Sequence, residues 1–184
     1  MKKTLLTSVI AAAVAFTFLP TNPLEAARTK RWTWKRYKIE FRLPSHWKVT
    51  KNTRRSFIAK GDGVVMKIGP SRNRRGTAKA VARRALRTYG VIYSKRVRRK
   101  AYIKSGGTGM YRYIIFGRAK YKLRRPRGYR GKPVTFGIIG LNSKKGYSNM
   151  YVRFYWFSRS SKARKNSRNT YKIAKSFKML RRYR

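Results

Sequence analysis

The segment MYVRFYWF (Met150–Phe157) has apolar or aromatic side chains at nearly every position. Successive side chains of a strand point to opposite faces, so both faces of this segment are largely apolar. An apolar character on both faces is typical of a strand that is covered on both sides. The segment therefore predicts a sheet that lies between two other layers.

Further strands are predicted on the N-terminal side of this segment. Ser56–Ala59 and Val64–Ile68 flank KGDG (Lys60–Gly63), and its Asp-Gly pair is a turn signal that predicts a hairpin. Asp62 is accordingly expected to be a turn residue and not a catalytic acid. Side chains alternate between two faces in the predicted strands Tyr37–Leu43 and Met110–Leu123. The remaining predicted strands are Lys48–Thr50, Val97–Lys104 and Val134–Leu141.

Two segments have the three- and four-residue spacing of amphipathic helices, Thr77–Tyr89 and Tyr171–Leu180. Thr77 is expected to cap the start of the first helix and Gly90 its end. The polar and basic stretch Ser158–Asn169 is expected to be a loop. The order strands, helix, strands, helix predicts an α+β fold, namely a single α/β/α sandwich with a mainly antiparallel sheet and one helix on each face.

The N-terminus, residues 1–27, has the layout of a secretory signal peptide. A basic start precedes the apolar run Leu5–Leu19, and small residues follow it, so cleavage is expected after Ala26 or Ala27. Residues 28–184 would then form one exported domain, periplasmic or secreted. A retained membrane anchor is the alternative, although a spanning helix needs about 20 apolar residues.

The charge is almost entirely of one sign, with 51 lysines and arginines against three acids among 184 residues. Ordinary proteins carry both signs in similar amounts. The repulsion among so many cations opposes compaction, and an anionic partner would relieve it. The composition therefore predicts a polyanion as partner, while a compositional bias without function is the alternative. With no cysteine in the chain, disulfides and thiolate metal sites are excluded.

The densest cationic cluster is KYKLRRPRGYRGKP (Lys120–Pro133), after the longest predicted strand. Arginine suits phosphate and sulfate because its planar group donates two parallel hydrogen bonds. Tyr129 is a candidate for stacking on a base or sugar, whereas Tyr121 is expected to pack inward. The predicted anion-binding residues are Lys95, Arg96, Arg98, Arg99, Lys100, Lys120, Lys122, Arg124, Arg125, Arg127, Tyr129, Arg130 and Lys132. Further basic clusters are Arg72–Arg75, Lys162–Arg168 and Arg181–Arg184.

Several motifs are similar to those of the PsbP-like α/β/α sandwich superfamily, which includes small exported bacterial domains. These motifs are FRLPSHWKV (Phe41–Val49), FIAKGDGVVMKI (Phe57–Ile68), GGTGMYRYIIFGR (Gly106–Arg118) and YKIAKSF (Tyr171–Phe177). The resemblance implies a docking or binding module without catalysis, and it transfers no functional residue. The strong positive charge departs from the usual pattern of that superfamily.

Catalytic residue sets are scarce, so the sequence does not favour an enzyme and predicts no metal or cofactor. His46 is the single histidine, and a His-Asp pair would have to use Asp62. The SGGTG segment (Ser105–Gly109) does not precede a helix, which favours a bend over a phosphate-binding loop. Three functions remain open: binding of nucleic acid, lipopolysaccharide or another envelope polymer; docking to an acidic protein; and action at an anionic membrane with peripheral contact.

Overall fold

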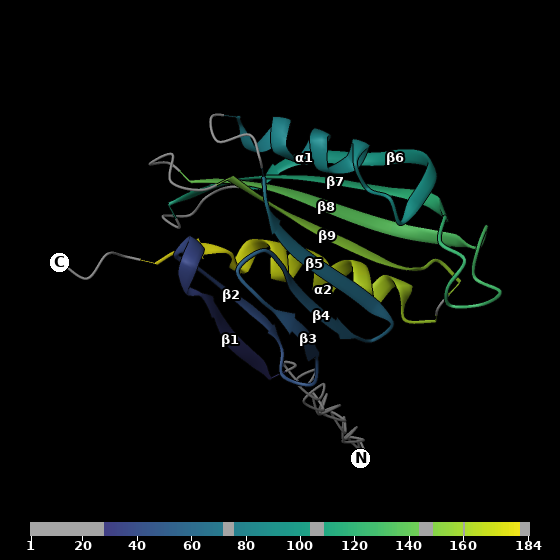
Figure 1. The fold of residues 1–184 in the computed structure, drawn as a ribbon, viewed down its shortest axis with the longest axis horizontal. Helices are drawn as coiled ribbons and strands as arrows, with labels where there is room; N and C mark the ends of the chain where they lie inside the picture. Colours follow the sequence, from purple (N-terminus) through teal and green to yellow (C-terminus); the bar gives the residue numbers. More distant parts are fainter. Residues whose placement is uncertain (1–27, 72–75, 104–108, 144–148, 160, 181–184) are drawn as a thin grey trace, which may run out of the picture.

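The computed structural model describes residues 28–71, 76–103, 109–143, 149–159 and 161–180, and these form two antiparallel sheets (Figure 1). The large sheet contains, in order across it, β3 (Lys48–Asn52), β4 (Phe57–Gly61), β5 (Val64–Pro70), β9 (Asn149–Phe157), β8 (Pro133–Ser143), β7 (Met110–Tyr121) and β6 (Ile92–Ile103). The small sheet contains β1 (Thr29–Trp34), β2 (Ile39–Pro44) and β10 (Lys178–Met179). A short 3-10 helix, η1 (Lys35–Tyr37), joins β1 to β2.

Two helices cover opposite faces of the large sheet in the described chain, α1 (Ala78–Arg87) and α2 (Ala163–Ser176) (Figure 1). The two faces have separate cores. Ile115 of β7 packs in the core that contains α1, and its neighbour Ile114 packs in the core that contains α2. The small sheet adds Phe41 and other apolar residues to the core on the α2 side. The predicted α+β fold, with a helix on each face, is confirmed.

The segment β9 is covered on both sides, as its sequence predicted. It lies between β5 and β8. Phe154 and Trp156 are buried in the core on the α2 side, while Tyr155 and Phe157 pack against the core on the α1 side. The apolar character of both faces therefore corresponds to burial on both faces.

The predicted hairpin and helix start are also confirmed. Asp62 and Gly63 make the turn between β4 and β5 with φ values of 51° and 73°. The Thr77 hydroxyl accepts a hydrogen bond of 3.2 Å from the Ala80 N–H and so caps α1. The predicted end of α1 is wrong, because the helix finishes at Arg87 and its last residues are followed by a turn before Gly90.

The C-terminal helix begins earlier than its apolar stripe predicted. Residues 163–169, expected to be a loop, form the first half of α2, and the chain after Ser176 leaves the helix to pair as β10 with β2. The buried face of this first half is polar: Asn166 and Thr170 are both fully buried. Asn166 is held because its amide donates to the carbonyl of Asp62 at 3.0 Å. Apolar periodicity does not predict a helix whose buried face is polar.

The observed strands differ from the predicted ones in three further places. Thr29–Trp34 was not predicted as a strand, yet it pairs with β2 along its whole length. The edge strand β6 starts at Ile92 and not at Val97. Residues at the start of β6 are mostly polar, and their pairing with β7 comes from backbone hydrogen bonds. The far end of β7 is shorter than predicted, since Leu123 lies beyond it and is exposed.

Candidate functional site

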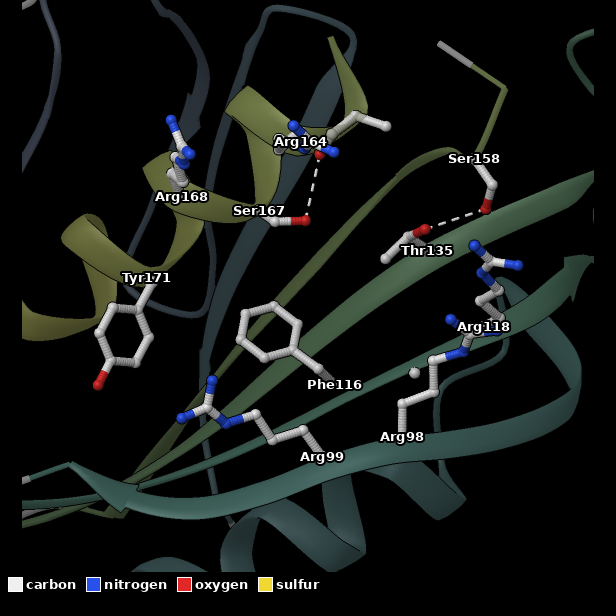
Figure 2. Close-up of a pocket in the computed structure, with 12 residues that line it drawn as sticks. Arg98, Arg99, Phe116, Arg118, Thr135, Ser158, Arg164, Ser167, Arg168 and Tyr171 are labelled. Atoms are coloured by element: carbon white, nitrogen blue, oxygen red, sulfur yellow. Dashed lines mark hydrogen bonds between the residues drawn. The ribbon is translucent and has the colours of Figure 1, made fainter. Parts of the chain in front are cut away.

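A groove of about 530 Å³ lies between α2 and the β6–β7 side of the large sheet (Figure 2). Among the described residues that line it, every charged side chain is an arginine. Two come from β6, one from β7 and two from α2, and all five are exposed: Arg98, Arg99, Arg118, Arg164 and Arg168. We call this feature the arginine groove.

A bulge in β6 supplies two neighbouring arginines to the groove. Val97 lies opposite Gly117 and Arg99 lies opposite Phe116, so Arg98 is an additional residue between them. A bulge alters the alternation of side chains along a strand, and both Arg98 and Arg99 line the groove. Gly117 has no side chain at this point, where a Cβ would collide with the backbone carbonyl of Arg96.

The opposite wall comes from α2. Arg164 and Arg168 are four residues apart, so they lie on one face of the helix. Ser167 lies between them, and its hydroxyl donates to the Ala163 carbonyl at 3.1 Å. Figure 2 shows the Phe116 ring between the two walls, below α2 and above β6. The groove therefore has two cationic walls and an aromatic floor.

Hydroxyl groups mark the two ends of the groove. Thr135 and Ser158 share a hydrogen bond of 3.0 Å at one end, and Tyr171 lies at the other (Figure 2). In the described chain, none of the five guanidinium groups makes a hydrogen bond or ion pair through its side chain. Each guanidinium carries five N–H donors and no acceptor. The arginine groove is therefore a donor-rich surface that is available to an anion.

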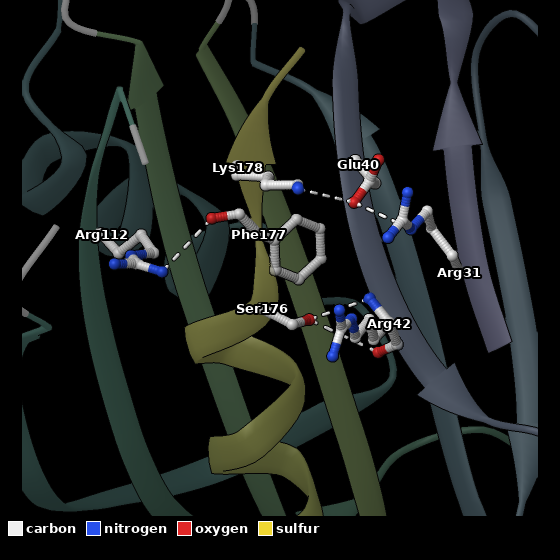
Figure 3. Close-up of polar contacts among 7 residues, drawn as sticks. All are labelled: Arg31, Glu40, Arg42, Arg112, Ser176, Phe177 and Lys178. Atoms are coloured by element: carbon white, nitrogen blue, oxygen red, sulfur yellow. Dashed lines mark hydrogen bonds and ion pairs between the residues drawn. The ribbon is translucent and has the colours of Figure 1, made fainter. Parts of the chain in front are cut away.

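The two acids in the described residues lie elsewhere and are already engaged. Glu40 is buried in the small sheet, where its carboxylate contacts Lys178 at 3.0 Å and Arg31 at 3.4 Å (Figure 3). Asp62 accepts hydrogen bonds from His46 at 2.8 Å and from Trp47 at 3.1 Å. Burial raises the pKa of the Asp62 carboxyl, but the hydrogen bonds from His46 and Trp47, together with the nearby charges of His46 and Lys165, outweigh it, so the pKa is lowered from 3.8.

Two other arginines are buried and serve the fold. Arg112 of β7 donates to the carbonyls of Lys175 and Phe177 at the C-terminal end of α2 (Figure 3). Arg153 of β9 donates to the Ala85 carbonyl at 2.8 Å, at the C-terminal end of α1. Burial lowers the pKa of both guanidinium groups. Helix C-termini carry partial negative charge and unpaired carbonyls, so a buried cation is stabilised there without a carboxylate.

The structure separates the predicted anion-binding residues into several places. Arg98 and Arg99 lie in the arginine groove, whereas Lys95 and Lys122 line a second hollow beside the end of α1. Lys95 donates from Nζ to the Leu86 carbonyl at 2.8 Å. Burial lowers the pKa of Lys95, and the nearby charges of Arg153 and Lys122 lower it further. Lys95 thus caps α1 and is a poor candidate for a surface contact.

The predicted cluster begins with the last two residues of β7, Lys120 and Tyr121, and continues as an exposed loop. Its cations are free of the core: Lys120, Lys122, Arg124, Arg125, Arg127, Arg130 and Lys132. Tyr121 is buried as predicted, and its hydroxyl donates to the Arg125 carbonyl at 2.9 Å. The Tyr129 ring, predicted as a ligand contact, packs 4.6 Å from the Phe157 ring and has the Lys132 ammonium 4.6 Å from its centre. Its aromatic surface is therefore largely used within the protein.

Sequence reasoning missed three of the five groove arginines as site residues, Arg118, Arg164 and Arg168. Arg164 and Arg168 belong to the predicted basic cluster Lys162–Arg168. The sequence did not predict that they share a face, because residues 163–169 were expected to be a loop and not a helix. Two other predicted residues do not line the groove. Lys100 lies opposite Ile115 and so points to the α1 side. Arg96 lies opposite the groove residue Arg118 but is not itself a lining residue. The SGGTG segment up to Thr108, and the clusters 72–75 and 181–184, fall outside the described residues.

The structure brings His46 and Asp62 together, with the His46 ring nitrogen 2.8 Å from the Asp62 carboxylate. The His46 side chain is half exposed, and it supports the β4–β5 turn together with Trp47. Within the described ranges, no three His, Cys, Asp or Glu residues come together in a way that would hold a metal ion. A search of the same residues finds no helix that is long and apolar enough to cross a membrane.

Comparison with known proteins finds similar folds but assigns no family. No protein-family model and no curated protein matches the chain. The fold is similar to the Ran-binding protein Mog1p of Saccharomyces cerevisiae, with 6% identity and a TM-score of 0.55 over 84% of this chain and 97% of that one. It is also similar to a Bacteroides thetaiotaomicron protein, with 12% identity and a TM-score of 0.51 over 84% of this chain. This chain spans half the length of the Bacteroides protein. At these identities the likeness shows the fold alone, and membership of the PsbP-like superfamily stays a prediction.

Proposed function

We propose that this protein is a non-enzymatic binding module that engages anionic polymers in the arginine groove. The observation that carries the proposal is the set of five exposed arginines around one groove, with no acid among the described residues that line it. A dispersed compositional bias would not require arginines from three separate elements to converge.

The chemistry of the groove suits phosphate or sulfate groups. Arginine presents a planar pair of donors to such oxyanions, and charge-assisted hydrogen bonds are stronger than neutral ones. A linear polyanion that binds here also releases its condensed counterions, which makes its affinity fall with added salt. The exposed cations of the β7–β8 loop add a long-range attraction that raises the rate of encounter.

A matched pair of double variants tests this proposal. Arg164→Ala with Arg168→Ala removes two charges from the groove, while Arg83→Ala with Arg84→Ala removes two from the exposed surface of α1 on the other side of the sheet. At 150 mM salt, the groove variant should weaken binding of a phosphate polymer by about 10- to 100-fold. It should also reduce the slope of log affinity against log salt by about 1 to 2.

The control variant should change the affinity by less than about threefold, because distant surface charges are screened at that salt concentration. Equal losses in the two variants would show that the attraction is diffuse, and the proposal would be rejected. Circular dichroism of both variants confirms that α1 and α2 remain folded.

Docking to an acidic protein is a second candidate, favoured by the structural likeness to a Ran-binding protein. The exposed arginines of α2 would contact carboxylates in that case. Capture of partners on the mature protein, with and without nuclease, separates the two candidates. A captured protein that persists after nuclease and is lost in the groove variant would favour docking.

We also propose that the chain is exported, on the basis of the leader-like residues 1–27, which lie outside the described structure. N-terminal sequencing of the exported fraction tests this proposal. The expected mature N-terminus is Ala27 or Arg28, and a chain that retains Met1 in that fraction would contradict it.

A further inference from the structure

The floor of the arginine groove is formed by the Phe116 ring. Phe116 lies over Gly137, where an added Cβ would come within 2.8 Å of the Phe116 ring. One side of the ring is therefore packed on the sheet. Its other side faces the groove between Arg99 of β6 and the arginines of α2 (Figure 2). A flat apolar surface between two rows of hydrogen-bond donors is complementary to a ligand that has a ring between anionic groups.

The balance of donors and acceptors narrows the class of ligand. The arginines offer donors alone, and the other polar lining side chains are the hydroxyls of Thr135, Ser158, Ser167 and Tyr171. No lining carboxylate or amide side chain is present among the described residues to accept hydrogen bonds from sugar hydroxyls. A ligand rich in acceptors, such as phosphate oxygens and the carbonyls and ring nitrogens of bases, fits this set better than a glycan rich in hydroxyls.

The size of the groove limits the ligand that it can hold. A volume of about 530 Å³ lies within the usual range for a small-molecule pocket. The groove therefore accepts one or two nucleotide units of a flexible strand, whereas the stacked bases of a duplex present no free face to the floor.

We propose that the arginine groove binds single-stranded nucleic acid, with a base stacked on Phe116 and the flanking phosphates held by the arginines of the two walls. This inference rests on the proposed function and specifies its ligand. Stacking of bases on aromatic side chains is tolerant of sequence, so the site would bind strands of any composition. An acidic peptide or a sulfated glycan, which has no base, would not use the floor.

The test compares ligands that differ only in the ring. Fluorescence anisotropy is measured with a 15-residue oligothymidylate and with a strand of equal length and charge whose central residues are abasic. The intact protein should bind the oligothymidylate about 5- to 100-fold more tightly, since stacking contributes roughly 1–3 kcal/mol for each base. A duplex of the same length and long-chain polyphosphate should resemble the abasic strand once affinity is expressed per phosphate.

Two matched variants locate the contact. Phe116→Leu keeps an apolar floor but removes the aromatic ring, and it should abolish the preference for the oligothymidylate while leaving the abasic strand unaffected. Tyr102→Leu is the control, because Tyr102 is a 62% exposed aromatic residue of the neighbouring strand β6 and pairs with Tyr113, on the α1 side. This control should preserve the preference. Photocrosslinking of a strand that carries 5-iodouracil supplies a second measurement without any variant, and the crosslinked peptide should contain Phe116 or Tyr171.

The outcomes separate this inference from the proposed function. Equal binding of the two strands, a preference that survives Phe116→Leu in a folded protein, or crosslinks outside the groove would overturn the inference. Equal competition by polyglutamate or heparin at matched charge would also overturn it. If the Arg164→Ala, Arg168→Ala variant still weakens every polymer in those cases, the proposed function stands. If that variant weakens none, the proposed function fails as well.

Discussion

Arginine has two distinct uses in this molecule. Arg153 is buried and donates to the Ala85 carbonyl, with its guanidinium carbon 4.3 Å from the centre of the Tyr151 ring. Arg112 completes the end of α2 in the same manner. Within the described part of the chain, the five arginines of the groove make no such contacts. A count of cations in the sequence cannot make this distinction, because it depends on which carbonyls each side chain meets in the fold.

Asp62 provides a prediction at the level of one residue. Its pKa is lower in the folded chain than in the unfolded one, so the folded state binds this proton less tightly. The stabilisation is therefore complete above pH 3.8 and is lost as the pH falls through the folded-state value. Asp62→Asn keeps a residue that tolerates the positive φ of 51°. This change should lower the free energy of unfolding by about 1 kcal/mol at pH 5 and by much less at pH 2.

Urea unfolding of the two proteins at several pH values measures this difference. A difference that stays constant between pH 5 and pH 2 would contradict the assigned role of the Asp62 carboxylate.

Helix α1 packs closely on β8 at a single glycine. A Cβ on Gly140 would collide with the Ala78 carbonyl and come within 2.7 Å of the Ala82 nitrogen, both in the backbone of α1. Neither atom belongs to a flexible side chain, so the helix itself must move if a side chain is added. The position of α1 therefore depends on the absence of a side chain in the neighbouring strand.

Gly140→Ala should accordingly destabilise the protein by about 1–3 kcal/mol, the range typical of overpacked cores. Gly90→Ala is the matched control, because no atom of the described residues lies within 4 Å of a Cβ at that position, and it should change stability by less than about 0.5 kcal/mol. Thermal and urea unfolding compare the three proteins. Equal stability of the Gly140 variant and the parent would show that α1 tolerates displacement.

Elements differ in how far the sequence predicts them. Strand β9 and the hairpin of β4 and β5 were predicted, since their apolar faces and the Asp-Gly turn are local signals. The first half of α2 was not, because Asn166 and Thr170 occupy its buried face. The arginine groove depends on that half-helix and on a bulge at Arg98, which no local signal marks. Arg98 and Arg99 were predicted as site residues because they lie in a basic run of the sequence, whereas their partners on α2 were not.

The whole molecule carries a formal net charge of +48. Repulsion among its cations destabilises the compact state, and salt reduces this repulsion because the screening length falls from about 30 Å at 10 mM to about 10 Å at 100 mM. The melting temperature should therefore rise between 10 mM and 300 mM sodium chloride. Circular dichroism at constant pH measures it. A melting temperature that is unchanged or lower at high salt would show that repulsion among the cations does not significantly destabilise the folded state.

The exposed edge of β6 has a consequence for solutions that contain both protein and ligand. An unpaired strand edge is a template for pairing with a second chain, and cationic side chains normally keep two such edges apart. In this protein Arg96, Arg98 and Lys100 are exposed along the edge strand and supply that protection. A strand of nucleic acid bound alongside β6 would neutralise these cationic side chains, so that the edges of two protein molecules could approach each other. Droplets or precipitates are therefore expected when the charges of protein and nucleic acid are about equal. They should dissolve again when either component is in excess.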